Sequence, residues 1–171
     1  YAAFGSKERL YREALEFYAA RHAGQVWNGF KQARTAKQAV EALLLDSAAS
    51  LPAEGRPTPA GCMVTLSAVG SEGCEDLGRL VASMRAEGLT LIRERLDRAV
   101  AEGELSPRID TKAVARFYAA VQAGLSIQAR DGATRADLEA AARAAIGGWD
   151  ALVGASPPVT PPPSSAPAPR A

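Results

Sequence analysis

The chain has 171 residues, of which 47% are hydrophobic, enough to form the core of one domain of ordinary size. Twenty basic and nineteen acidic residues leave a net charge of +1, which excludes a strongly basic surface for nucleic acid within this sequence. Two cysteines are too few for a disulfide framework, and no uninterrupted apolar run is as long as a membrane span. We therefore expect a cytoplasmic protein that does not enter a membrane.

The N-terminal third of the sequence predicts two amphipathic helices and a loop. Ser6 is a good N-cap residue, and apolar side chains then recur at helical spacing to about Gly24. A second helix runs from the polar stretch 32–38 to about Ser50. The stretch 52–59 contains three prolines and a glycine. It predicts a loop, because proline removes a backbone donor and disfavours helix in the residue before it.

A short apolar helix over 60–69 precedes the longest predicted helix. Apolar side chains keep helical spacing throughout 77–100, with charged residues opposite them. Gly103 follows at the position where a left-handed residue is favoured, and Pro107 prevents the helix from continuing. The long helix is therefore expected to end just before Gly103.

Two more helices are predicted before the C-terminal tail. Asp110 is placed to cap the first of them, and Thr134 with Asp137 resembles a capping box that opens the last, which extends to Leu152. No run alternates with the period of a strand, so the predicted fold class is all-α. Proline, alanine and serine dominate 154–171, which predicts a disordered tail because it has too few apolar side chains to offset the entropy of ordering.

The first ten residues contain a specific pattern: Tyr1, then Phe4, the pair Ser6-Lys7, and Leu10. This pattern resembles the end of the helix-turn-helix of the TetR family of bacterial transcriptional regulators. The resemblance implies that Tyr1 closes the recognition helix and contacts a DNA phosphate, and that Lys7 opens the next helix and contacts the same backbone. Ser6-Lys7 alone would fit an ordinary capped surface helix. Two alanines follow Tyr1 where many members have an aromatic residue and a histidine, which implies a weaker hold on phosphate.

The order and lengths of the helices over about 60–152 also resemble the TetR C-terminal domain. The resemblance implies a helical bundle that dimerises through its last two long helices, while the preceding helices enclose an effector pocket. It implies that 1–5 is the end of an N-terminal DNA-binding domain whose remainder lies upstream, and that 6–153 is the ligand-binding and dimerisation domain. The predicted function is a TetR-type repressor whose binding to operator DNA is controlled allosterically by a small lipophilic effector.

Site residues follow from this resemblance and from the residue types. Effector pockets are mainly apolar with a few polar anchors. The predicted pocket residues are Tyr18, Met63, Leu66, Met84, Phe117, Tyr118 and Gln122. Small residues and a second apolar face on the last two helices predict a symmetric homodimer, although alanine-rich helices alone would look similar. The predicted interface residues are Leu125, Gln128, Ala129, Ala140, Ala144, Gly148 and Trp149.

Other functions find little support in the residues. The single histidine, His22, has no evident proton-transfer partner, and no glycine-rich loop follows a strand, so we expect neither an enzyme nor a cofactor or metal site. Cys62 and Cys74 could sense oxidants or simply pack in the core. The alternative to a repressor is a stand-alone helical ligand-binding or interaction module without a DNA function.

Overall fold

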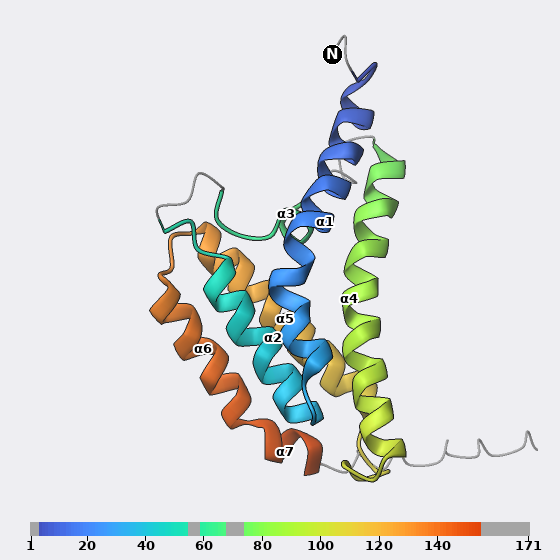
Figure 1. The fold of residues 1–171 in the computed structure, drawn as a ribbon, viewed down its shortest axis with the longest axis vertical. Coiled ribbons are helices and arrows are strands. Elements are labelled where there is room, and N and C mark those ends of the chain that lie inside the picture. The colour runs from blue at the N-terminus through green and yellow to red at the C-terminus, as the bar shows by residue number, and fades with distance from the viewer. Residues whose placement is uncertain (1–3, 55–58, 68–73, 155–171) are drawn as a thin grey trace, which may run out of the picture.

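A computed structural model describes residues 4–54, 59–67 and 74–154. Within these ranges the chain forms seven helices and no strand, which confirms the all-α prediction (Figure 1). The helices are α1 (Lys7–Gln32), α2 (Ala36–Ser50), α3 (Met63–Leu66), α4 (Glu75–Ala101), α5 (Thr111–Arg130), α6 (Arg135–Gly147) and α7 (Trp149–Gly154). Tyr1 lies outside the described residues, and so does the predicted tail apart from Gly154.

The predicted start signals of three helices are confirmed. The side chain of Ser6 caps α1, and Asp110 caps α5 through a bond of 2.9 Å from the Ala113 N–H to Oδ1. At α6, the Thr134 N–H donates to Asp137 Oδ2 at 3.0 Å while the Asp137 N–H donates to Thr134 Oγ1 at 3.2 Å. These bonds satisfy N–H groups that have no partner within their own helix.

Helix α1 is longer than expected, and the prediction that it ends near Gly24 is wrong. Phe30 is buried against α2, so tertiary packing outweighs the low helix propensity of glycine. The two helices approach closely at Gly29, where a Cβ atom would lie 2.6 Å from Asp46 Oδ2 and 3.1 Å from the Cβ of Ala42. A side chain at position 29 would therefore push α1 away from α2.

The C-terminal end also differs from the prediction of one continuous last helix. The chain breaks at Gly148, and Trp149 begins the separate helix α7. Trp149 is turned into the core, where its ring lies 5.7 Å from that of the fully buried Tyr118. Burial of a large aromatic side chain outweighs the continuity of the helix after two consecutive glycines. The short predicted helix over 60–69 is confined to α3 within the described residues.

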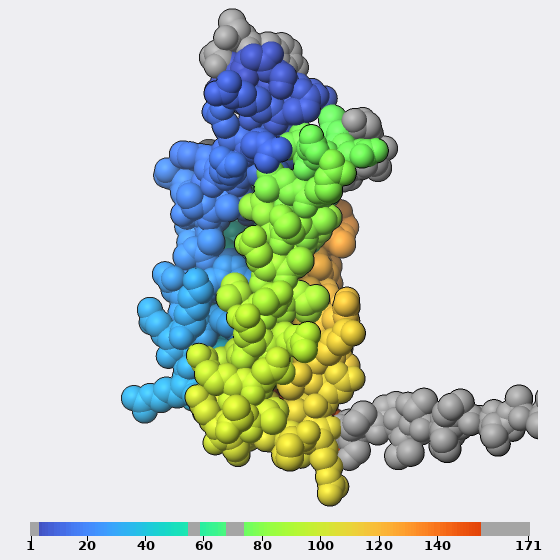
Figure 2. All heavy atoms as spheres, turned by 90° about the vertical axis from the view of Figure 1, so that its right-hand side faces the viewer, coloured from blue at the N-terminus to red at the C-terminus, as the bar shows by residue number. Residues whose placement is uncertain are grey.

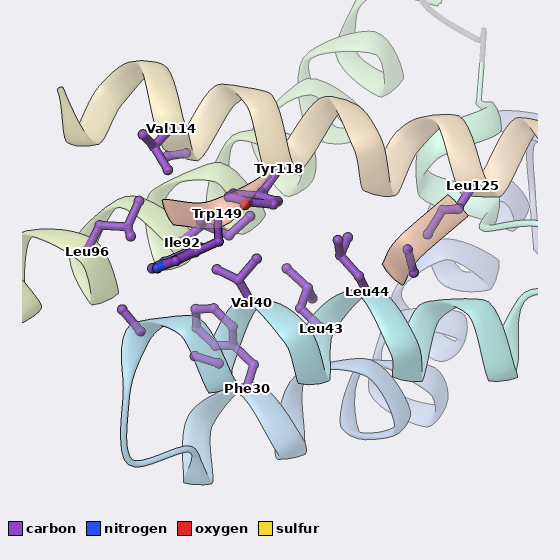
Figure 3. Close-up of a cluster of buried hydrophobic side chains, with 14 of the residues drawn as sticks. Phe30, Val40, Leu43, Leu44, Ile92, Leu96, Val114, Tyr118, Leu125 and Trp149 are labelled. Carbon is purple, nitrogen blue, oxygen red and sulfur yellow. The ribbon is translucent and has the colours of Figure 1, made fainter. Parts of the chain in front are cut away.

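Helix α2 forms the centre of the bundle. It contacts α1, α4, α5 and α6, and Figure 3 shows Val40, Leu43 and Leu44 pointing toward side chains of the surrounding helices. Helices α1 and α4 run side by side, and the N-terminal end of α1 projects beyond the rest of the bundle (Figures 1 and 2). The bundle thus leaves one end of α1 free of the core.

A buried ion pair joins the opposite end of the bundle. The Arg95 side chain is only 3% exposed, and its Nη2 donates to Glu104 Oε2 at 3.2 Å and to the Arg34 carbonyl at 3.1 Å. The other oxygen of Glu104 accepts the Ala36 N–H at 2.5 Å. The pair therefore connects α4 and the loop after it to the turn between α1 and α2.

Replacing Glu104 by Gln should destabilise the fold, because it leaves the buried Arg95 charge without a counter-charge. We expect the free energy of unfolding, measured by urea denaturation, to fall by about 3 kcal/mol. Glu75→Gln is the matched control, since Glu75 pairs with Arg79 on the surface of α4 where both side chains are largely exposed. That exposed pair should contribute little. Equal losses in the two variants would contradict the interpretation of the buried pair.

Candidate functional site

A cavity of about 300 Å³ lies beside residues 11–22 of α1. Its walls come from α1, from the segment that contains α3, and from the last residue of α5. The lining residues are Tyr11, Tyr18, His22, Pro59, Ala60, Gly61, Met63, Leu66, Ser67 and Arg130. Segments far apart in the sequence therefore meet at one site.

Three residues of α1 form one wall of the cavity. Tyr11, Tyr18 and His22 follow one another at i, i+7 and i+11, a spacing that places them on the same helical face. The rings of Tyr18 and His22 are stacked, with 4.6 Å between their centroids and 30° between their planes. Three aromatic side chains thus line this wall.

The opposite wall depends on a glycine. Gly61 has a φ of +85°, and a Cβ atom there would lie 2.5 Å from Leu66 Cδ1 and 2.9 Å from the Ser126 carbonyl oxygen. The neighbouring Cys62 N–H donates to Ser126 Oγ at 2.8 Å. Only glycine allows the segment to turn so close to α5.

Two further contacts hold α3 between its neighbours. The hydroxyl groups of Tyr11 and Ser67 are hydrogen-bonded to each other, which joins α3 to α1. From α4, Arg85 Nη1 donates to the carbonyl oxygens of Val64 at 3.1 Å and Ser67 at 3.3 Å. A ligand that moved α3 would therefore also act on α1 and α4.

The polar groups of the cavity differ in charge. Burial raises the pKa of the Tyr18 hydroxyl well above its usual range, and the neighbouring Cys62 thiol raises that pKa further. The Tyr18 hydroxyl therefore stays protonated and uncharged. Arg130 contributes a permanent positive charge, and the lining contains no carboxylate.

The structure brings three of the seven predicted pocket residues to this cavity: Tyr18, Met63 and Leu66. The other four lie elsewhere. Met84 is half-buried on α4, Phe117 is 40% exposed, Tyr118 is fully buried in the core, and Gln122 Nε2 donates to Ser47 Oγ at 3.1 Å. Helical spacing identifies an inward-facing residue but does not distinguish the core from a cavity.

Several lining residues were missed by sequence reasoning. The spacing of Tyr11 and His22 relative to Tyr18 is a signal that could have found the α1 wall. No local pattern marks Gly61, Ser67 or Arg130, because they come together only when the loop before α3 packs against the end of α5.

The predicted interface residues divide into two groups. Gln128, Ala140 and Ala144 are exposed and Gly148 is half-buried. Leu125, Ala129 and Trp149 are 1%, 2% and 3% exposed, because α2 and the other helices of the same chain already cover them. Dimerisation itself stays a prediction.

The other candidate residues lie outside the cavity or beside it. Lys7 is exposed as the first residue of α1, and its contact with phosphate stays a prediction. Cys62 and Cys74 are free and half-buried, and the Cys74 thiol lies 3.8 Å from Glu8 Oε1. Over 4–54, 59–67 and 74–154 there is no cluster of three or more potential metal ligands, and no helix in those ranges has the length and apolarity to cross a membrane.

Comparison with known proteins places the chain among transcriptional regulators. No family model matches it. It is 30% identical over 160 residues to the HTH-type transcriptional repressor ComR of Escherichia coli K12, an alignment that covers 90% of this chain and 73% of ComR. Its structure is similar to that of a cysteine mutant of the TetR family regulator CifR bound to 26-base-pair operator DNA, with a TM-score of 0.78, 37% identity, and coverage of 87% of this chain and 77% of that one.

A putative TetR regulator from Rhodococcus sp. RHA1 is also similar, with a TM-score of 0.61 and 30% identity over 86% of this chain and 78% of that one. The chain belongs to the TetR family of transcriptional regulators. This confirms the family and the TetR-like fold that the first ten residues and the order of the helices predicted.

The raised pKa of Tyr18 predicts how stability depends on pH. Above about pH 10, the ordinary tyrosine pKa, the unfolded chain loses the phenolic proton while the folded chain keeps it, so folding becomes less favourable as pH rises. Tyr18→Phe removes this contribution. We expect its free energy of unfolding, measured in urea between about pH 9 and pH 11, to fall less steeply than that of the wild type. Parallel curves would contradict the assignment.

Proposed function

We propose that this chain is the ligand-binding and dimerisation part of a repressor that binds operator DNA. A small lipophilic effector binds to the same protein and changes its affinity for the operator. The observation that carries the proposal is the likeness, at 37% identity, to a TetR family regulator solved on its operator. The similarity to the repressor ComR supports repression rather than activation of transcription. No separate observation favours a module without a DNA function.

The DNA-facing end is the projecting N-terminus of α1. Ser6 caps this helix through a 3.1 Å bond from the Arg9 N–H, and exposed Lys7 follows directly. Helix N-termini attract phosphate through their free N–H groups and partial positive charge, and a lysine adds a full charge there. By the family resemblance, Tyr1 and Lys7 hold the phosphate backbone beside the base-reading helix.

The effector site is the cavity beside α1, and α1 carries both the cavity wall and the DNA-facing end. Its 26 residues span about 39 Å at 1.5 Å per residue. A bound effector would change the contacts of Tyr11 with Ser67 and so the position of α1. Because such coupling is reciprocal, effector and operator must alter each other's affinity by the same factor.

Lys7→Gln should weaken operator binding by the full-length protein. Its binding constant should depend less on salt: the slope of log K against log salt concentration should become smaller in magnitude by about one, because one phosphate contact is lost. Fluorescence anisotropy with DNA from the promoter of its own gene measures the slope. The matched control is Lys31→Gln, at the other end of the same helix, where the residue is also exposed. An unchanged slope for Lys7→Gln would count against the phosphate contact.

Homodimerisation is supported by an apolar stripe on the outside of α5 and α6, two helices that pack against each other. On α5 the stripe repeats at intervals of three and four residues, as in the seam of a helix bundle. Phe117 is 40% exposed and Ile127 is 51% exposed. The same two helices also carry small residues that are exposed or half-buried: Ala120 and Gly124 on α5, and Ala136, Ala140, Ala144 and Gly147 on α6. A second copy of the chain would cover this stripe.

Ile127→Asp should dissociate the dimer, since it would place a carboxylate without a partner in the covered stripe. We expect the dimer dissociation constant to rise at least about hundredfold, measured by analytical ultracentrifugation. Phe17→Asp is the control, because Phe17 is 66% exposed on α1, away from α5 and α6. If both variants stayed dimeric, the stripe would not be the interface.

A further inference from the structure

We propose that the effector is a small apolar molecule with a single carboxylate, which is held by Arg130. This inference rests on the proposed effector site and adds the chemical class of its ligand. It depends on three observations: the charge of the lining, the bonding of Arg130, and the size and surface of the cavity.

The charge of the lining favours an anion. Arg130 is positive, and no aspartate or glutamate lines the cavity. A cationic ligand would meet this charge without any compensating carboxylate. A carboxylate would meet a guanidinium, whose planar set of N–H donors matches it in a two-bond geometry.

Arg130 has spare donors. Its one hydrogen bond within the described residues is a long contact of 3.5 Å from Nη1 to the Ala60 carbonyl, and it forms no ion pair there. The nearby arginines of α6 behave differently, because Arg135 and Arg143 both pair with Glu139 at 2.7 Å and 3.3 Å. Arg130 is thus an arginine of the lining that is able to bind a ligand anion without giving up an ion pair.

The hydroxyl groups of the lining are already engaged. The hydroxyl groups of Tyr11 and Ser67 bond to each other, and that of Tyr18 interacts with the Cys62 thiol and the Met63 N–H. Arg130 is thus the one side chain of the lining with a permanent charge, beside the imidazole of His22. The ligand should therefore have one charged group and an otherwise apolar body.

The shape of the cavity defines that body. Its volume of about 300 Å³ is at the lower end of the range for ligand pockets. The aromatic side chains of Tyr18 and His22, which are stacked on each other, lie in the α1 wall, and Met63 and Leu66 come from the α3 segment. A single ring with a short alkyl group fits this volume and can make apolar and aromatic contacts with these side chains.

Three isosteric probes test the inference on the full-length protein: para-ethylbenzoate, para-ethylbenzamide and the cation para-ethylbenzamidinium. We expect isothermal titration to give at least about tenfold tighter binding of the benzoate than of the benzamide, the usual effect of one charge-assisted pair, and no binding of the amidinium. Arg130→Gln should remove the preference and leave the benzamide affinity unchanged, while Arg130→Lys should retain part of the preference. Arg98→Gln, an exposed arginine of α4, is the charge-matched control and should change nothing.

The outcomes separate the two proposals. Equal binding of the benzoate and the benzamide, or a preference that survives in Arg130→Gln, overturns the assignment of a carboxylate ligand but leaves an effector site in place. Leu66→Trp should fill the cavity and abolish benzoate binding, and unchanged binding would place the anion elsewhere. If neither these probes nor a library of neutral lipophilic compounds raised the melting temperature, the proposed effector site itself would fail.

Discussion

Helix α2 contacts α1, α4, α5 and α6, and its Val40, Leu43 and Leu44 are wholly inaccessible to solvent. The apolar side chains of this helix are buried only if other helices cover them, so the four neighbours are arranged around it. This burial requires the close approach of α1 at Gly29, and it brings Tyr118 and Trp149 together in the core. The positions of the remaining helices follow from the need to cover α2.

The cavity lies at the end of the bundle where α2 no longer separates α1 from the other helices. Beyond the C-terminal end of α2, α1 faces the four-residue helix α3, which contains no fully buried residue. Hydrogen bonds from Cys62 to Ser126 and from Arg85 to the end of α3 fasten this segment instead of a broad apolar contact. Segments with few buried contacts are the ones that open or shift most readily. The weakly packed part of the fold is therefore also the part that contacts the N-terminal half of α1.

Helices α5 and α6 carry large apolar side chains on the side that faces the core and mostly small ones on the outside. On the C-terminal helices, large side chains such as Leu125 and Trp149 serve the core of the chain itself. Alanine and glycine, with Phe117 and Ile127, are left on the outside of α5 and α6. Small side chains let two helix pairs approach closely at little cost in entropy. The same two helices can therefore complete the core of their own chain and still present an outer surface that another helix pair can pack against.

The amino-acid sequence by itself determined the fold class, the caps at Ser6, Asp110 and Thr134, the extent of the longest helix, and the family. These features are local: periodicity, capping chemistry and a short motif act within a few residues. Only the tertiary structure decided that α1 continues past Gly24 and that the chain breaks at Gly148.

The tertiary structure alone also separated Tyr18 from Tyr118, two tyrosines on inward-facing helix surfaces that look alike in the sequence. One lines the cavity and the other is buried against Trp149. The physical reason is that periodicity identifies which face of a helix turns inward, whereas the neighbour it meets depends on segments far away in the chain. The cavity owes its positive charge to such a distant contact, because Arg130 at the end of α5 meets the loop before α3 only in the folded chain.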